Sequence, residues 1–245
     1  MSNFNIIKLD AIASTNDELK LLHRKGVVKD GTVLWAKHQY AGRGQREKKW
    51  ISEENKCLTF SIYKVFEPPL GNGFSLSKAV TVGLFRALQE LSVPNLEVKW
   101  PNDILSANSK IGGILIENFY RKKTLFASVI GIGLNINQEV FENLPEATSL
   151  FLKCQKKYEL DWVLEIVLNH LKYPLDRLIE EDAFFHTYFE KKLWRKNQLS
   201  EFSKGKETFI ATPIGITESG ALRVLDENDN EKLLYSHSYQ MKYKV

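Results

Sequence analysis

The sequence has few of the features that mark a disulfide-bonded, secreted or membrane-spanning protein. Its 245 residues include only 2 cysteines, Cys57 and Cys154, which lie too far apart for a metal-binding pair or a disulfide framework. Its longest apolar runs fall far short of a membrane span. Residues 1–5 lack the basic segment and apolar stretch of a signal peptide. We therefore expect a cytoplasmic protein with no membrane partner.

Further absences narrow the possible functions. The sequence contains no internal repeat and no low-complexity segment. Its 5 histidines show no pairing that suggests a metal, and no spacing typical of a Ser-His-Asp triad occurs. The net charge of +4 is too small to demand a polyanionic partner. We therefore expect no metal site built from protein ligands and no specific nucleic-acid partner.

The composition that remains is that of a globular protein. Hydrophobic residues make up 43% of the chain and charged residues 26%, so disorder is not expected. Apolar periodicity predicts strands at residues 4–9, 32–38, 57–65, 97–100, 111–120 and 125–137, and helices near residues 15–25, 76–91, 160–179 and 183–199. Thr15 and Glu18 fit a capping box, with Ser14 as an alternative cap, and Pro174 is expected to interrupt its helix.

The pattern changes near residue 200. Short strands are predicted at residues 208–211, 215–217, 221–225 and 232–235, separated by polar turns. We therefore expect an α+β catalytic domain over residues 1–199, in which helices pack on a mixed β-sheet. A small all-β module, resembling a barrel, is expected over residues 200–245.

A long polar loop contains the first of four motifs. It reads Gly42-Arg43-Gly44-Gln45-Arg46-Glu47-Lys48-Lys49-Trp50. Glycines let backbone amides approach an anion, the four basic residues add charge, and Trp50 offers a flat face to a base. The loop carries no P-loop pattern. A solvated basic loop anchored by Trp50 explains the same residues about as well.

The second motif, Lys99-Trp100-Pro101-Asn102-Asp103, follows a predicted strand. Pro101 favours extended backbone at Trp100 and so presents the next two side chains at the end of the strand. Asp103 can accept a proton or orient an amine. A simple Asx-turn between two strands is the competing interpretation.

The last two motifs place glycine inside predicted strands. Lys110 stands just before Gly112 and Gly113, where it can neutralise charge on a phosphoryl group. A surface lysine beside a β-bulge is the alternative. Gly131 and Gly133 resemble the start of a dinucleotide-binding fingerprint, but no third glycine and no helix follow. These glycines are expected to clear space for a ligand.

Taken together and in order, the motifs resemble the catalytic domain of biotin protein ligases over about residues 4–137. The resemblance rests on Ser14-Thr15-Asn16, Gln39, Gly42-Arg43-Gly44, Lys99-Trp100-Pro101-Asn102-Asp103, Lys110-Ile111-Gly112-Gly113 and Gly131-Ile132-Gly133-Leu134-Asn135. It implies a sheet of the type found in class II aminoacyl-tRNA synthetases, followed by an SH3-like barrel.

The resemblance also implies a two-step reaction. Biotin and ATP would form biotinyl-AMP and pyrophosphate, and a lysine of a biotin carboxyl carrier protein would then take the biotinyl group and release AMP. Because the first step brings two anions together, cationic side chains must offset their repulsion. Mg²⁺ would be expected to neutralise the polyphosphate.

The same resemblance assigns roles to individual residues. Those expected to bind biotin are Ser14, Thr15, Asn16 and Gln39 on the ureido ring, with Gly42 and Arg43 along the tail and carboxylate. Those expected near the nucleotide or intermediate are Gln45, Arg46, Lys48, Trp50 (stacked on adenine) and Asn102, and Gly44 and Asn135 are expected to bind biotin or ATP. The expected pocket floor is Gly113, Gly131 and Gly133. The expected catalytic residues are Lys110 and Arg43, which offset charge, and Asp103, which assists the incoming amine.

Two departures and two alternatives qualify this assignment. Gln45 stands where the family commonly has arginine, and Glu47 where it commonly has glycine. We hypothesise that Arg46 or Lys48 compensates for the lost charge in retaining the adenylate. The resemblance to the family starts at Ser14-Thr15-Asn16, so we expect no room for the DNA-reading module of some family members and no binding to a specific operator. The alternatives are a lipoate-type ligase, which uses the same adenylate chemistry, and a biotin-binding protein with weakened catalysis.

Overall fold

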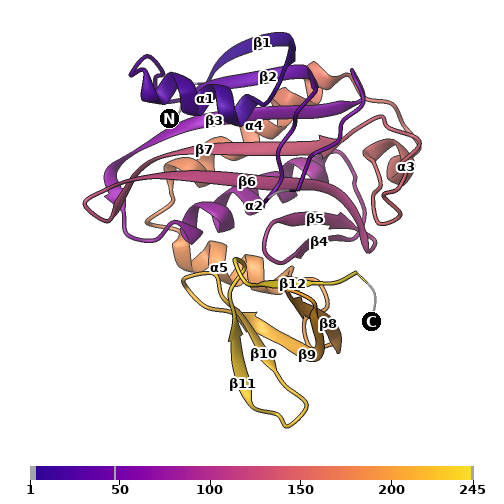
Figure 1. The fold of residues 1–245 in the computed structure, drawn as a ribbon. Coiled ribbons are helices and arrows are strands. Elements are labelled where there is room, and N and C mark those ends of the chain that lie inside the picture. The colour runs from indigo at the N-terminus through magenta and orange to yellow at the C-terminus, as the bar shows by residue number, and fades with distance from the viewer. Residues whose placement is uncertain (1–3, 47, 244–245) are drawn as a thin grey trace.

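The computed structural model describes residues 4–46 and 48–243, which form two sheets with helices packed against them (Figure 1). The larger sheet has seven strands. In spatial order they are β1 (Asn5–Ile12), β2 (Thr32–Gln39), β3 (Cys57–Leu70), β7 (Thr124–Asn135), β6 (Ser109–Arg121), β5 (Asp103–Ser106) and β4 (Leu96–Lys99). Only β1 and β2 pair in parallel, so this sheet is mixed.

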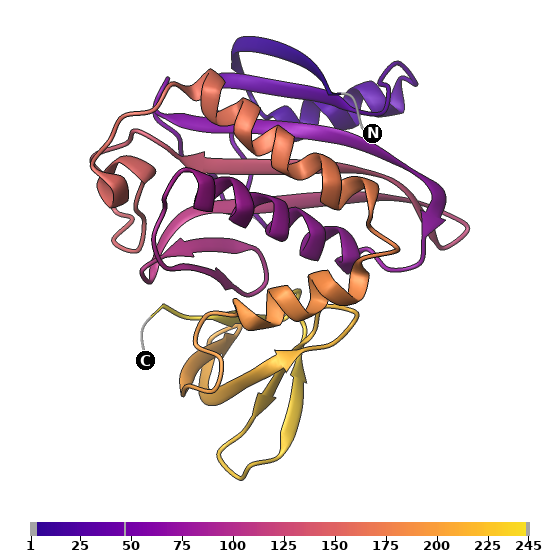
Figure 2. The ribbon, with the colours of Figure 1, turned by 180° about the vertical axis from the view of Figure 1, so that it is seen from behind.

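Helices cover both faces of the larger sheet. The helix α1 (Thr15–Arg24) buries Leu19 against β2, β3 and β7 in a small cluster of its own. The helices α2 (Phe74–Glu90) and α4 (Leu160–Asp176) pack on the other face and build the main core (Figure 2). The short α3 (Leu150–Cys154) follows β7, and α5 (Asp182–Lys191) packs against α2.

The second sheet belongs to the C-terminal module. Its strands are β8 (Ser200–Lys204), β9 (Glu207–Ile216), β10 (Leu222–Leu225), β11 (Glu231–Leu234) and β12 (Tyr239–Met241), all antiparallel, in the order β11-β10-β9-β8-β12. The module lies beyond the β4–β5 edge of the larger sheet and next to α5 (Figure 1). Its five antiparallel strands fit the expected SH3-like barrel, and the predicted α+β class is confirmed. The boundary at residue 200 remains a prediction, although the second sheet begins there.

Several details of the predicted elements are wrong. The strands β5, β8 and β12 and the helix α3 were not predicted, and the two strands expected at residues 208–217 are one continuous strand. Ser14, not Thr15, is the N-cap of α1, because the Ser14 Oγ accepts from the backbone N–H of Asp17. Pro174 lies inside the last turn of α4 and is buried there, so it does not interrupt the helix. Short strands and chain ends give too little periodicity for prediction from pattern alone.

Strand register brings the glycine motifs together. Gly133 on β7 pairs with Gly113 on β6, and Gly131 on β7 pairs with Ser61 on β3. Small residues are therefore adjacent across three central strands. The result is a low area on the sheet, over which the loop at residues 39–50 can lie.

Candidate functional site

A cavity of about 160 Å³ lies over this low area of the sheet. Four parts of the chain enclose it: the start of α1, the loop after β2, the β4–β5 turn with Lys110, and the β11–β12 segment of the C-terminal module. The residues predicted for binding that line it are Ser14, Thr15, Asn16, Gln39, Arg43, Gly44, Gln45, Arg46, Lys48, Trp50, Asn102, Asp103, Lys110, Gly113, Gly131 and Gly133. Residues spread over more than 100 positions of sequence thus surround one space.

At one end of the cavity, neutral polar groups form a buried network. The backbone N–H of Thr15 donates to the Gln39 Oε1 at 2.7 Å, and the Thr15 hydroxyl lies 2.6 Å from the Ser61 Oγ. Ser61, which is completely buried, donates to the Asn16 Oδ1 at 2.6 Å. Because a backbone N–H can only donate, this contact fixes the Gln39 amide with its oxygen towards Thr15. Its NH₂ group remains for a ligand carbonyl.

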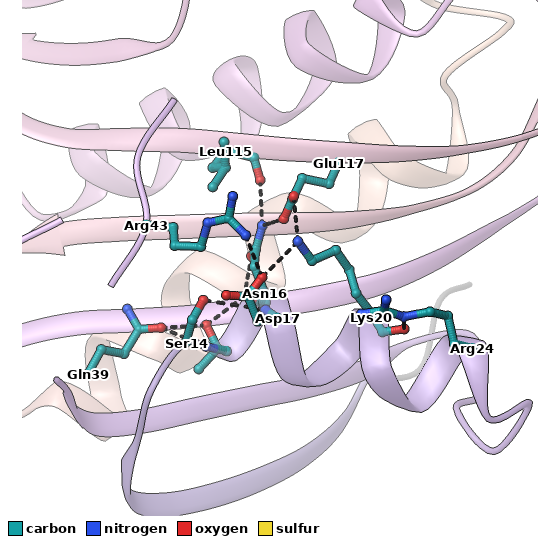
Figure 3. Close-up of polar contacts among 11 residues, drawn as sticks. Ser14, Asn16, Asp17, Lys20, Arg24, Gln39, Arg43, Leu115 and Glu117 are labelled. Carbon is teal, nitrogen blue, oxygen red and sulfur yellow. Dashed lines mark hydrogen bonds and ion pairs between the residues drawn. The ribbon is translucent and has the colours of Figure 1, made fainter. Parts of the chain in front are cut away.

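Asn16 is held from the other side as well. Its Nδ2 donates to the Glu117 Oε2 at 2.9 Å and to the Leu115 carbonyl at 3.3 Å (Figure 3). Both of its N–H donors therefore have protein acceptors, and the Oδ1 lone pair left by Ser61 is the group that can meet a ligand. We therefore expect Asn16 to accept a hydrogen bond from a ligand and not to donate one.

An ion-pair chain leads from this network to the first motif. Glu117 Oε1 accepts from Lys20 at 2.7 Å, Lys20 also pairs with Asp17 at 2.7 Å, and Asp17 pairs with Arg43 at 2.8 Å (Figure 3). Burial by itself would raise the pKa of Asp17. The hydrogen bonds from Lys20 and Arg43 outweigh it and hold that pKa below its ordinary value. Arg43 therefore already has a carboxylate partner, with which any bound anion competes.

The glycines of β7 make room for protein side chains first. A Cβ on Gly131 would lie 2.2 Å from the Asn16 Oδ1, and a Cβ on Gly133 would lie 2.5 Å from the Trp50 ring. Both glycines also line the cavity, and their expected role of clearing space for a ligand remains a prediction. They let Asn16 and Trp50 lie against the sheet, and those side chains form the walls.

The first motif folds into a tight hairpin. The backbone N–H of Trp50 donates to the Gly42 carbonyl at 2.9 Å, and the backbone N–H of Gly44 donates to the Lys48 carbonyl at 2.7 Å. A Cβ on Gly42 would lie 2.5 Å from the Trp50 carbonyl oxygen, so a larger residue would open the hairpin. Gly42 contacts Trp50 rather than lining the cavity. Glu47, the second departure from the family, lies outside the described residues.

Two side chains of the hairpin have unexpected surroundings. The Trp50 indole N–H is buried and has no hydrogen-bond acceptor within residues 4–46 and 48–243. Arg46 donates to the backbone carbonyls of Ser236 and Tyr239 and so joins the hairpin to the C-terminal module. Arg46 and Lys48, the two residues proposed to replace the missing charge, both line the cavity, and in the described part of the chain Arg46 is the one of them that is hydrogen-bonded to the module.

Cationic groups gather at the other end of the cavity. Lys110 Nζ donates to the Asp103 Oδ1 at 2.6 Å and lies 5.7 Å from the centre of the Trp50 ring. In the β5–β6 ladder Lys110 pairs with Leu105 and Asp103 pairs with Gly113, on either side of a register shift, and the long Lys110 side chain reaches Asp103 from there. Lys110, Asp103 and Trp50 come together as the sequence motifs predicted. This end of the cavity suits a polyanion.

Lys99 is a site residue that was not predicted. It is only 6% exposed, lines the same cavity and lies 4.3 Å from the centre of the Tyr243 ring. Burial lowers its pKa to about 8; the Asp103 charge opposes this shift, and the Lys110 charge adds to it. Its place in the second motif was a signal, but a lysine before tryptophan gives no sign of its burial.

Three more residues of the site were missed. Ser61 and Glu117 hold Asn16, and Tyr243 donates to the Asp103 Oδ2 at 3.1 Å. A serine within the apolar strand at residues 57–65 was a usable signal for Ser61, since a buried hydroxyl needs a partner. Nothing in the sequence near Tyr243 relates it to Asp103, which lies 140 residues earlier.

Two predicted binding residues have mainly structural contacts. Asn135 donates to the Thr148 carbonyl at 2.9 Å and is not among the residues that line the cavity, so it holds the loop after β7. Asn102 lines the cavity, yet its amide donates to the Ile114 carbonyl at 2.6 Å and so ties the β4–β5 turn to β6. A binding role for either residue remains a prediction.

The described residues contain no group of three or more histidine, cysteine, aspartate or glutamate side chains that could hold a metal ion. Asp103 is the one carboxylate among the described residues that line the cavity, and both its oxygens already accept hydrogen bonds. Mg²⁺ is commonly held by one or two carboxylates together with substrate phosphates. This donor set therefore fits a magnesium ion only where phosphate oxygens supply most of the ligands.

Comparison with known proteins places this site in a family. The sequence profile described as "Biotin/lipoate A/B protein ligase family" matches residues 9–135. "Bifunctional ligase/repressor BirA" of Bacillus subtilis is 27% identical over 97% of this chain and 74% of its own length. "Biotin--[acetyl-CoA-carboxylase] ligase" of Mycobacterium tuberculosis is 36% identical over 58% of this chain and 54% of its own length.

A solved structure agrees over the whole chain. The biotin protein ligase of Aquifex aeolicus in complex with biotin and ATP is similar to this structure with a TM-score of 0.82 and 28% sequence identity. The similarity covers 97% of this chain and 98% of the Aquifex chain, so it includes the C-terminal module.

No helix within the described residues is long and apolar enough to cross a membrane.

Proposed function

The chain belongs to the biotin/lipoate A/B protein ligase family, and from this premise we propose that it activates biotin with ATP and transfers it to a lysine of a biotin carboxyl carrier protein. The observation that carries the proposal is the composition of the cavity. A neutral hydrogen-bonding network at one end and a group of lysines at the other open into the same space. A ureido ring with a carboxylate tail matches the first end, and a triphosphate matches the second.

In the first step, the neutral network orients biotin. The Gln39 NH₂ donates to the ureido oxygen, and the Asn16 Oδ1 accepts from a ureido N–H, because these are the groups their protein contacts leave available. Arg43 then draws the carboxylate towards the nucleotide. This role is supported by the position of Arg43 in the lining of the cavity, where it pairs with Asp17 at 2.8 Å.

At the second end of the cavity, the negative charge of the ATP triphosphate is offset by three lysines, Lys110, Lys99 and Lys48. The biotin carboxylate oxygen attacks the α-phosphorus, the bond to the bridging oxygen of the β-phosphate breaks, and pyrophosphate leaves. Fixed cations stabilise this charge without reorganisation, and such groups commonly supply several kcal/mol of barrier reduction. Mg²⁺ would enter with the triphosphate, held mainly by phosphate oxygens, and would neutralise part of their charge.

In the second step, the acceptor lysine attacks the mixed anhydride. Its nitrogen bonds to the acyl carbon, the bond from that carbon to the phosphate oxygen breaks, and AMP leaves. Asp103 takes the proton from the amine. Lys110, 2.6 Å from Asp103, remains beside the departing phosphate.

The test is ATP-dependent transfer of labelled biotin to a carrier domain. We expect pyrophosphate release with biotin and none with lipoate, and labelled carrier in the presence of Mg²⁺ that EDTA abolishes. Release with lipoate alone would establish the lipoate-type ligase instead. Tight biotin binding without pyrophosphate release would establish the weakened biotin-binding protein.

We also propose that the chain acts in the cytoplasm and binds no specific DNA. The Bacillus relative is named a ligase and repressor, so the comparison makes DNA binding a necessary control. A salt-resistant mobility shift with biotin-operon DNA would contradict the proposal.

A further inference from the structure

The end of the C-terminal module reaches the catalytic end of the cavity. After β12, the backbone N–H of Lys242 donates to the Glu201 carbonyl at 2.8 Å and holds the chain against β8. Tyr243 then extends towards the catalytic domain. Its ring lies 5.7 Å from that of Trp194 and 4.3 Å from the Lys99 Nζ. The ring is therefore held between the two domains.

The Tyr243 hydroxyl completes the hydrogen bonding of Asp103. Lys110 occupies the Oδ1 at 2.6 Å, and Tyr243 occupies the Oδ2 at 3.1 Å. Burial and the neighbouring Asp103 charge raise the pKa of Tyr243, so the phenol keeps its proton and is the hydrogen-bond donor to the Asp103 carboxylate. While Tyr243 is bound, both oxygens of Asp103 are therefore occupied by hydrogen bonds, and neither is open to an incoming amine.

The hydrogen bonds of Asp103 to Lys110 and to Tyr243 differ in how easily they can be broken. Lys110 is on β6, which pairs with the strand of Asp103. Tyr243 lies outside any strand, one residue after Lys242, whose backbone N–H holds this segment to β8. An amine that approaches Asp103 therefore displaces the phenol at a lower cost than the lysine. The hairpin of the first motif is tied to the same segment, through Arg46 and the Tyr239 carbonyl.

We propose that Tyr243 is a positioning residue for Asp103: it holds Asp103 against the Lys110 ammonium during biotin activation, and it releases Asp103 to the acceptor lysine during transfer. This inference rests on the proposed function. No proton moves between Tyr243 and Asp103. The acceptor amine takes the place of the phenol at the Oδ2, its nitrogen bonds to the acyl carbon as AMP leaves, and its proton passes to Asp103.

The variant Tyr243→Phe tests the hydroxyl alone, since the ring against Lys99 and Trp194 remains. The matched control is Tyr235→Phe, which removes the hydroxyl of a module tyrosine that is 47% exposed and does not line the cavity. Two half-reactions are measured separately: biotin-dependent exchange of pyrophosphate into ATP, and transfer of preformed labelled biotinyl-AMP to a carrier domain, with its kcat and KM. Tyr243→Ala is a second variant, in which the ring is absent too.

We expect Tyr243→Phe to slow exchange roughly tenfold, about the worth of one charge-assisted hydrogen bond. Transfer of preformed adenylate is expected to keep its rate or to gain, with a lower KM for the carrier. Tyr243→Ala should match Tyr243→Phe in exchange, because the hydroxyl is what both lose. Tyr235→Phe should match the parent in both half-reactions.

Equal losses in both half-reactions, or no change in either, would overturn the inference, as would a loss seen with alanine and not with phenylalanine. A loss in Tyr243→Ala alone would mean that the Tyr243 ring has only a structural role and that its hydroxyl is not needed. These outcomes differ from failure of the proposed function, in which the parent itself shows no biotin-dependent exchange.

Discussion

Lys99 places a positive charge in a wall of the cavity where water has little access. Its pKa of about 8 lies within the range in which enzymes are assayed, whereas an exposed lysine stays charged there. Below pH 8 it contributes a cation to the triphosphate end, and above pH 8 it is neutral. The same side chain thus makes binding of the nucleotide dependent on pH.

We expect the affinity for ATP to fall as the pH rises through about 8, because the proton of Lys99 is lost there. Lys99→Arg should remove that fall, since a guanidinium stays charged. Isothermal titration of ATP between pH 7 and 9.5 measures both. Identical pH profiles of the two proteins would show that another group is responsible.

Ser61 holds together the neutral end of the cavity. Its hydroxyl stands between the Thr15 hydroxyl and the Asn16 Oδ1, at 2.6 Å from each. Without it, two groups that face biotin lose a partner while they stay buried. An unpaired buried polar group costs about 1–3 kcal/mol.

Ser61→Ala is expected to weaken biotin binding roughly tenfold, because a loss of about 1.4 kcal/mol corresponds to that factor. Ser128→Ala is the matched control: Ser128 is equally buried and donates to the Asn118 Oδ1 at 2.7 Å, away from the cavity. Both variants should lose similar thermal stability, and only Ser61→Ala should lose affinity in a biotin titration. Equal affinities of the two variants would contradict the role of Ser61.

At the scale of elements, β7 and the hairpin at residues 42–50 depend on each other. Gly133 lets the Trp50 ring lie against the strand, and the Gly42–Trp50 hydrogen bond closes the hairpin over it. The strand alone is a flat surface, and the loop alone has few apolar anchors. Their contact makes a wall with an indole N–H that has no protein acceptor within the described part of the chain.

We expect Gly133→Ala to displace Trp50 and weaken ATP binding roughly tenfold, because overpacking of this kind costs about 1–3 kcal/mol. A Cβ at Gly133 would lie 2.5 Å from the ring, whereas a Cβ at Gly71 would meet nothing within 4 Å. Gly71→Ala is therefore the control, and ATP titrations of both variants provide the measurement. Unchanged affinity in Gly133→Ala would mean that Trp50 does not shape the nucleotide site.

At the scale of the whole molecule, the two sheets are joined by a buried charge. Lys78 on α2 is fully buried and pairs with Asp182 on α5 at 2.9 Å and with Glu218 of the module at 3.3 Å. Next to this cluster, the Trp100 indole N–H donates to the Gly220 carbonyl at 3.0 Å. The β9–β10 turn of the module therefore contacts the second motif directly.

Lys78→Ala is expected to reduce the free energy of unfolding by roughly 1.5–3 kcal/mol, the worth of hydrogen bonds to charged groups, because its partners Asp182 and Glu218 are 29% and 71% exposed and can be hydrated in the variant. The control Lys8→Ala breaks an exposed pair with Asp161 and should change it by less than about 1 kcal/mol. Denaturant unfolding, followed by circular dichroism, distinguishes them. A loss in Lys78→Ala no larger than in Lys8→Ala would show that the charge contributes little to joining the sheets.

The amount predictable from sequence differs with scale. The long periodic elements were predictable, such as α2, α4 and the β6–β7 hairpin, and so was the α+β class. The residues of the four motifs were predictable as a group, because glycine, lysine and aspartate in those orders carry chemical meaning without a fold. The short strands β5, β8 and β12 and the place of Pro174 were not, since a few residues carry no period.

What the sequence by itself determined is the list of chemical groups and the family to which they belong. Only the tertiary structure decided which groups meet. Register across β3, β7 and β6 put Ser61, Gly131, Gly133 and Gly113 together, and docking of the module brought Tyr243 to Asp103. It also decided that Lys99 is buried. Local pattern specifies strands and turns, whereas the pKa of a lysine or the partner of a carboxylate depends on segments far away in sequence, which only packing brings into contact.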